Sequence, residues 1–454
     1  MLTSRVHSLG AILALLVSII YLNFFCGQSH FYEILSAYSV AFVGYFIFLR
    51  SLVGEGSVGD LFKIGVATGI VLRVVLIFAF PLLSDDIYRF LWDGHLMHKG
   101  VHPLSFLPSD LIKDSALADG YLRSIYAQLN SPNYFTVYPP ISQLVFYLAT
   151  LSESWSIYVS AGVIKLILLL SDVGILLMLR KLLIRFDVSP RWSLIYFLNP
   201  LVITEVSGQI HFESLMVFFL CGTFHALSKG MLRVAGFSLA LSIGTKLLPL
   251  MFVPLFMKHL NDRVGNSSFL NSFFKFFAPF GAVLLLTFGP FFRSLDLGNF
   301  MASLNLYFQS FEFNASLYYL LRWLGYLLSG YNQIAIIGPL LSLVTVGLIA
   351  YFSLTKKIDN LSQLWKYCMM AFTCYLFCTT TIHPWYLIML IFFATAIRSW
   401  WVLVWSALII LSYSTYRHPD FQQDLFLISL EYFVVFGLFY WSWSRGRLYN
   451  GPEK

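Results

Sequence analysis

The amino-acid sequence predicts an all-α protein that crosses a membrane many times. Of its 454 residues, 58% are hydrophobic and only 11% are charged, whereas a soluble protein carries about 25% charged residues. Apolar runs of about 18 residues or more recur from one end of the chain to the other, and each is long enough to cross a bilayer core. Lys and Arg gather in short loops, which the positive-inside rule places in the cytoplasm. We therefore attribute the net charge of +7 to membrane topology and not to nucleic-acid binding.

A path with about 12 membrane spans follows when the basic loops are placed in the cytoplasm. The region around LSIGTKLLPL is expected to break into two short helices. The expected spans are 8–26, 33–49, 61–82, 156–180, 192–206, 210–228, 268–290, 333–354, 363–381, 385–397, 400–415 and 425–443.

Two long segments then lie on the non-cytoplasmic side, 83–140 and 291–330, and the second contains a short amphipathic part. The apolar segment ISQLVFYLATLSE between them is too short to span comfortably, so we expect a half-embedded or interfacial helix. If it crossed the membrane, the basic cluster RKLLIRFDVSPR would lie outside, against the charge rule. The sequence therefore predicts one transmembrane domain, 1–454, with a large first outer loop that carries juxtamembrane helices.

The segment SDDIYRFLWDGHLMHKGVHP directly follows the third apolar run. Ser84 is a suitable N-cap, and it places Asp85 and Asp86 in the favourable first turn of a helix. If this helix continues, Asp85, Arg89 and Asp93 share one face. By spacing alone, the pattern fits a surface amphipathic helix as well as it fits a functional site.

Further polar residues favour a functional site. An ionisable side chain at the bilayer centre costs about 2.5–3.5 kcal/mol on insertion scales, so such residues usually mark a site. On the expected path, five of them lie at the same membrane face as the carboxylate pair of the first loop. These five are Glu205, His211, Glu213, Lys246 and His383.

These residue types suit chemistry on a phosphate-linked lipid. A carboxylate at an aqueous membrane face can act as a general base toward a hydroxyl. Arg89, Lys246 or a histidine could neutralise a developing phosphate charge. Alternatively, Asp85 and Asp86 could hold Mg²⁺ or Mn²⁺, which prefer oxygen ligands. No other cofactor is expected.

Four motifs resemble glycosyltransferases of the GT-C superfamily, most closely the bacterial polyprenol-phosphate-mannose-dependent mannosyltransferases. The first-loop segment, with a later YPP, is similar to that family's S-D-D-x-Y-R-Y-x-W-D-G and G-x-N-P. NPLVITEVSGQIHFES resembles its N-P-L-x-x-x-E-x-x-G-x-x-H-x-D segment. IGTKLLPLMFVP and HPWYLIML resemble its V-K-L-x-P-L and H-P-W-Y-L segments. The sequence departs from the pattern at Phe90, His102 and Glu213, where the family has Tyr, Asn and Asp.

The resemblance implies a GT-C-like bundle that transfers a hexose, with mannose favoured, from a polyprenyl-phosphate donor to an acceptor hydroxyl with inversion. The acceptor would be a glycan, a glycolipid or a protein. The transfer would take place at the non-cytoplasmic face of a bacterial inner membrane. Asp85 would be the base and Asp86 its orienting or metal-binding neighbour, although these two roles are interchangeable at this level. Arg89 and Lys246 would bind the donor phosphate. The substrate-binding residues would be Asp93, Glu205, His211, Glu213, His383 and Trp385.

Two other functions stay open from the sequence. A transporter or flippase of a lipid-linked saccharide would line a pathway with the same groups, although no internal repeat or paired broken helices are evident. An acyltransferase that uses His383 as its base would leave Asp85 and Asp86 without a role. Glycosyl transfer is therefore the leading hypothesis.

Overall fold

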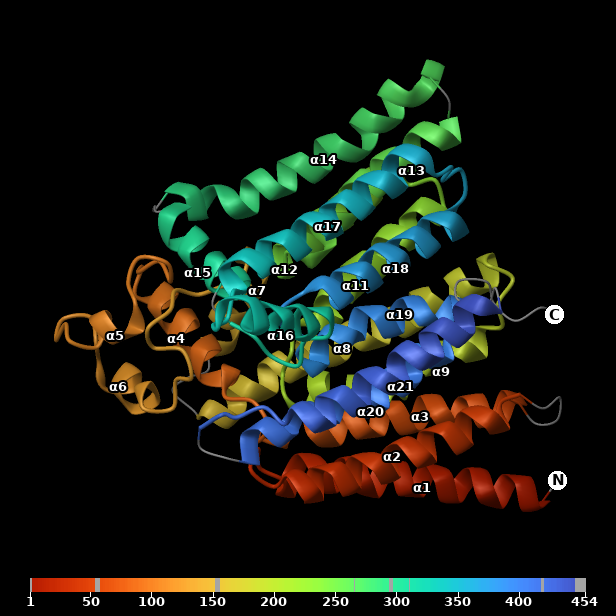
Figure 1. Cartoon of the computed structure of the whole chain (residues 1–454), viewed down its shortest axis with the longest axis horizontal. Helices are drawn as coiled ribbons and strands as arrows, with labels where there is room; N and C mark the ends of the chain where they lie inside the picture. Colours follow the sequence, from red (N-terminus) through yellow and green to blue (C-terminus); the bar gives the residue numbers. More distant parts are fainter. Residues whose placement is uncertain are drawn as a thin grey trace. The chain divides into compact units, whose positions relative to one another are not determined.

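The computed structural model describes residues 2–53, 58–151, 156–264, 266–293, 297–309, 311–417 and 420–445. These residues form a polytopic, all-helical membrane protein, which confirms the predicted fold class. Within these ranges the only β-type pairing is an isolated bridge between Phe313 and Thr381. Figure 1 shows long helices accompanied by many short ones.

The chain divides into two compact units. The first unit comprises Met1–Leu83, Leu168–Cys221 and Ile382–Lys454. The second unit comprises Ser84–Ile167 and Gly222–Thr381. Two helices, α8 (Ile157–Arg185) and α11 (Glu213–Ser228), contribute residues to both units.

The first unit packs helices from both ends of the chain. Its other elements are α1 (Leu2–Phe25), α2 (Phe31–Ser51), α3 (Val58–Leu76), η1 (Pro190–Ser193), α9 (Leu194–Phe197), α10 (Pro200–Val202), the π-helix η2 (Ile203–Gly208), η4 (Pro384–Tyr386), α19 (Leu387–Ile397), α20 (Trp400–Leu408), η5 (Ile409–Arg417) and α21 (Leu425–Ser444). A buried ion pair joins α3 to α8, with Arg73 Nε 2.7 Å from Asp172 Oδ2. The hydroxyl of Tyr196 on α9 donates to the other Asp172 oxygen at 3.0 Å, so the carboxylate is paired and hydrogen-bonded, as a buried charge requires.

The second unit contains residues 84–140, nearly all of the segment that the sequence predicts as the first outer loop. Its other elements are α4 (Asp86–His98), α5 (Pro108–Leu111), α6 (Gly120–Tyr126), α7 (Pro140–Thr150), α12 (Leu232–Thr245), η3 (Leu248–Phe252), α13 (Val253–Val264), α14 (Asn266–Arg293), α15 (Leu297–Gln309), α16 (Leu317–Ser329), α17 (Ile334–Thr355) and α18 (Leu361–Cys378). α4 lies so close to α7 that a Cβ atom at Gly94 would come within 2.4 Å of the Phe146 carbonyl oxygen. Glycine at position 94 therefore allows the two backbones to touch.

Some of the roughly 12 predicted spans are broken or are shorter than a full crossing. By length and composition, six described helices can cross a membrane, or seven if the bent pair Pro200–Gly208 and Glu213–Ser228 counts as one span. That pair bends by 114°. The expected span 192–206 is instead four short elements, and 385–397 begins with the short η4. The six helices are Val6–Phe25, Phe31–Ser51, Ile157–Arg185, Phe269–Pro290, Ile334–Thr355 and Leu425–Ser444.

Proline explains much of this difference. Pro190, Pro200 and Pro384 each stand at the start of a short element, where a residue without an N–H and with a fixed φ begins a helix but cannot continue the one before it. Hydropathy registers the apolar length but not these breaks. By contrast, the predicted break near Lys246 is confirmed, and α7 has only 11 residues, which is too short for a span.

Candidate functional site

The carboxylate pair stands at the start of α4. Asp85 is the N-cap residue, so the prediction that Ser84 caps this helix is wrong by one position. The Ser84 hydroxyl instead accepts the backbone N–H of Asp86 at 3.4 Å. Asp85 is exposed and Asp86 is half-buried. Both negative charges lie at the positive end of the helix dipole, which stabilises them.

Two side chains from farther along the loop fix the Asp86 carboxylate. The Tyr138 hydroxyl donates to Oδ2 at 3.0 Å, and the Asn130 amide donates to Oδ1 at 2.9 Å. The sequence indicated Tyr138 only as part of the YPP motif, and it gave no sign of Asn130. The available signal was the YPP motif, because Pro139 and Pro140 start α7 and thereby hold Tyr138 in place.

Arg89 and Asp93, predicted to share one face of the helix, form an ion pair on α4. Arg89 Nε lies 2.9 Å from Asp93 Oδ1, and the two side chains are only 4% and 0% exposed. Arg89 Nη1 also donates to the carbonyl oxygens of Ser131 and Tyr134, and Gln143 Nε2 donates to Asp93 Oδ2 at 2.9 Å. The alternative of a helix whose charges are merely solvated does not fit, because Arg89 and Asp93 are buried against residues 131–143, although Asp85 at the helix start is exposed.

The far end of α4 is tied to α6 by a second charged cluster. Asp119 Oδ2 lies 2.7 Å from His95 Nε2 and 2.8 Å from Lys99 Nζ, and Oδ1 accepts the backbone N–H of Leu122 at 3.0 Å. Burial raises the pKa of Asp119, but the hydrogen bonds from Leu122, Lys99 and His95 outweigh it, so the pKa lies well below its usual value. Both ends of α4 are thus fixed within the loop.

Lys246 lies at the break between α12 and η3. Its backbone is extended, with φ −146° and ψ 143°, and its side chain is half-buried. The carbonyl oxygen of the preceding residue, Thr245, accepts the Ser142 hydroxyl of α7 at 2.8 Å. The segment 138–142 therefore supports Asp86 through Tyr138 and the Lys246 backbone through Ser142.

A separate polar group lies in the first unit. Glu205, within the π-helix η2, accepts the Tyr413 hydroxyl at 3.0 Å, and its other carboxylate oxygen lies 3.0 Å from His211 Nδ1. Glu205 and His211 are 0% and 2% exposed. Ile210, a β-branched residue, adopts φ +66° in the turn that leads to His211. Such strain is uncommon and tends to occur at functional sites.

Three stacked rings extend this group. The imidazole of His211 stacks on the indole of Trp385, with centroids 3.7 Å apart and planes 19° apart. The imidazole of His383 stacks on the same indole at 4.4 Å and 3°. Glu213, fully buried, opens α11 two residues after His211. Trp385 thus holds both histidines in place, whereas the sequence predicted only contact with substrate.

The ten predicted site residues therefore fall into two groups. Asp85, Asp86, Arg89, Asp93 and Lys246 belong to the second unit. Glu205, His211, Glu213, His383 and Trp385 belong to the first unit. Their predicted convergence into one site stays a prediction.

The residues that the structure describes contain no group of three or more His, Cys, Asp or Glu side chains that could hold a metal ion. Both oxygens of Asp86 already accept hydrogen bonds from Tyr138 and Asn130. A Mg²⁺ or Mn²⁺ ion at Asp85 and Asp86 stays a prediction.

Comparison with known families gives one match. Residues 23–261, more than half of the chain, match the MptA_B family, described as alpha-(1->6)-mannopyranosyltransferase, N-terminal domain. The match includes the first outer loop, Glu205 to Glu213 and Lys246, whereas His383 and Trp385 lie beyond it. No curated protein matches the chain.

Proposed function

The chain belongs to the alpha-(1->6)-mannopyranosyltransferase family and is a multi-pass membrane glycosyltransferase, and we propose that it moves mannose from a polyprenyl-phosphate donor to an acceptor hydroxyl with inversion. The acceptor is a glycan, a glycolipid or a protein. The reaction takes place on a GT-C-type helical bundle, at the non-cytoplasmic face of a bacterial inner membrane.

The observation that carries this proposal is the fixed carboxylate pair at the start of α4. Asp85 is exposed, whereas Asp86 is held by Tyr138 and Asn130. We therefore assign the proton transfer to Asp85. Asp86 is assigned the task of fixing the helix start, because both of its oxygens are already engaged. A carboxylate in this position can take the proton of a sugar hydroxyl as it attacks.

In the transfer step, Asp85 removes the proton from the acceptor hydroxyl. The acceptor oxygen attacks C1 of mannose from the face opposite the phosphate, and a new C1–O bond forms with inverted configuration. The old bond between C1 and the phosphate oxygen breaks, and its electron pair leaves with polyprenyl phosphate. Lys246, half-buried at the break after α12, supplies the positive charge that stabilises this leaving group.

Arg89 was predicted to bind the donor phosphate. Its contacts with Asp93, Ser131 and Tyr134 favour a positioning role instead, because they join α4 to the segment that carries Asn130 and Tyr138. In this role Arg89 and Asp93 act on the reaction through Asp86.

The group in the first unit is assigned to hydroxyl recognition. His211 Nδ1 lies 3.1 Å from the backbone carbonyl oxygen of Glu205 and 3.0 Å from its carboxylate Oε2, and these contacts fix the orientation of the ring and leave Nε2 directed away from Glu205. Histidine nitrogens and carboxylates are suitable partners for sugar hydroxyls. Glu213 and His383 share this assignment, and Trp385 positions the two histidines.

Purified protein in liposomes, supplied with a candidate acceptor, tests the proposal by product mass and linkage analysis. We expect transfer from polyprenyl-phosphate mannose, none from a nucleotide-diphosphate mannose, and an inverted anomeric configuration in the product. Movement of intact lipid-linked sugar across the liposome membrane without transfer would show a flippase and reject the proposal.

A further inference from the structure

Helix α16 presents an apolar surface on almost all sides. Its sequence is LYYLLRWLGYLLS, and only Tyr318 and Gly325 are buried. A water-soluble helix shows the opposite arrangement, with its apolar side chains inside and its polar ones outside. The exposed large apolar residues are Leu320, Leu321, Trp323, Leu324, Tyr326, Leu327 and Leu328, of which Leu328 is 86% exposed.

This helix is too short to cross a membrane. Its 13 residues span roughly 20 Å at about 1.5 Å per residue, against about 30 Å for a bilayer core. A contiguous apolar surface of this kind marks contact with another apolar phase.

The one charged residue of α16 is neutralised within the protein. Arg322 forms an ion pair with Glu312, and its guanidinium lies 4.5 Å from the centre of the Tyr319 ring. Glu312 also accepts the Tyr318 hydroxyl at 2.6 Å and the Asn332 amide at 3.2 Å. The Arg322 and Glu312 side chains are only 18% and 21% exposed. Pairing of this kind lowers the cost of placing a charged residue in hydrocarbon.

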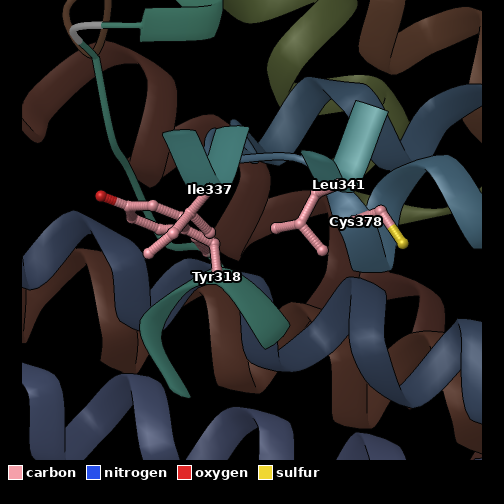
Figure 2. Packing of buried hydrophobic residues seen from close by; sticks show 5 residues of the cluster. Tyr318, Ile337, Leu341 and Cys378 are labelled. Atoms are coloured by element: carbon pink, nitrogen blue, oxygen red, sulfur yellow. The ribbon is translucent and has the colours of Figure 1, made fainter. Parts of the chain in front are cut away.

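The inner side of α16 is anchored on two neighbouring helices. Tyr318 belongs to one buried hydrophobic cluster with Ile337 and Leu341 of α17 and Cys378 of α18 (Figure 2). After α16, Gly330 takes φ +80° and ends the helix, and the membrane-spanning α17 begins at Ile334. The exposed surface of α16 therefore continues, within a few residues, into a helix whose own exposed residues include Ile336, Leu340 and Leu343.

We propose that α16 is a membrane-inserted half-helix whose exposed leucines and Trp323 contact lipid acyl chains, with Arg322 and Glu312 as its internal ion pair. The partner of this surface is bilayer lipid, because the surface adjoins the lipid-facing side of a span and its charge is neutralised without water. The exposed side of α16, Leu317–Ser329, then lies in lipid and is not a solvated part of the second outer loop.

Nitroxide labels on the full chain in liposomes test this proposal. Variants Leu324→Cys and Leu328→Cys are compared with Leu343→Cys on α17 as a lipid control and with Ser115→Cys, exposed in the first loop, as a water control. Native protein treated in the same way gives the blank, because four of its five cysteines are buried. We expect labels on α16 to collide often with oxygen and rarely with a water-soluble nickel chelate, as at Leu343. Collision rates like those at Ser115 would show that α16 lies in water and would overturn the proposal. Low collision rates with both oxygen and the nickel chelate would also overturn it, because they would show that another protein covers α16.

The ion pair gives an independent test. Glu312→Gln leaves the Arg322 charge without its counter-ion in lipid, so we expect Tm to fall by several degrees, whereas Glu312→Gln with Arg322→Met restores most of the loss. Breaking the exposed pair Lys113–Asp110, with side chains 74% and 60% exposed, should leave Tm unchanged. Equal Tm for the parent and Glu312→Gln would contradict a lipid-embedded pair.

Discussion

The Tyr138 hydroxyl donates to the carboxylate of Asp86 at 3.0 Å, and 52 residues of sequence separate the two. This bond links the start of α4 to the start of α7. The first outer loop is therefore closed on itself around its carboxylate pair. The contact also suggests how the loop keeps Asp85 in a fixed place for proton transfer.

Removing this bond should slow the reaction. Tyr138→Phe keeps the ring, which packs edge-on against Phe90 at 5.0 Å, and removes only the donor. A hydrogen bond to a charged group contributes about 1.5–3 kcal/mol, so we expect kcat to fall by roughly 10- to 100-fold. This prediction is checked by measuring kcat for Tyr138→Phe, Asp86→Asn and the double variant. Strictly additive effects would show that the two residues do not act as a unit.

The close contact of α4 with α7 predicts a loss of stability. Gly94→Ala would place a Cβ 2.4 Å from the Phe146 carbonyl oxygen, so the helices must move apart. Overpacking of this kind costs about 1–3 kcal/mol. Gly10→Ala is the matched control, since a Cβ there meets nothing within 4 Å. Thermal unfolding in detergent should separate the two variants, and equal Tm values would argue against the contact.

Asp119 predicts a pH-dependent contribution to stability. Because its pKa is lowered in the folded protein, its stabilising effect is fully present above the ordinary pKa of about 3.9 and disappears as the pH falls toward the folded pKa. Asp119→Asn should therefore lower Tm at pH 7 and bring it closer to that of the parent below about pH 4. A Tm difference that stays constant or grows with acid would contradict the assignment.

The Glu205–His211 pair predicts an effect on substrate binding. Glu205→Gln keeps the backbone carbonyl that contacts His211 but removes the negative charge 3.0 Å from His211 Nδ1, so we expect KM to rise by roughly tenfold. Glu431→Gln is the matched control, because Glu431 is equally buried in the first unit and accepts the Trp405 Nε1–H at 2.8 Å. It should lower stability without changing KM. Steady-state kinetics of both variants test this prediction. A KM of Glu205→Gln equal to that of Glu431→Gln would contradict the assigned role of Glu205.

Contacts between residues close in the sequence could be predicted, whereas contacts between residues far apart in the sequence could not. The Arg89–Asp93 pair lies at i, i+4 spacing and the break at Lys246 follows from polar residues inside an apolar run, so both could be predicted. Tyr413 and Glu205 are 208 residues apart, and nothing in either local segment indicates their contact.

Burial explains why some predicted spans are short helices in the described part of the chain. Every residue of α19 except Thr395 is apolar and the helix is almost wholly buried, so it reads as a span although it has only 11 residues. A helix enclosed by protein does not need the full length that contact with lipid would demand. Burial by neighbours cannot be read from hydropathy alone.

The most direct measurement is the rate of mannosyl transfer from polyprenyl-phosphate mannose by Asp85→Asn, with Asp110→Asn, an exposed acid of the same loop, as control. General-base catalysis contributes about 10²- to 10⁴-fold, so Asp85→Asn should lose activity to that extent at unchanged Tm, while Asp110→Asn keeps full activity. Full turnover by a normally folded Asp85→Asn variant would contradict the account.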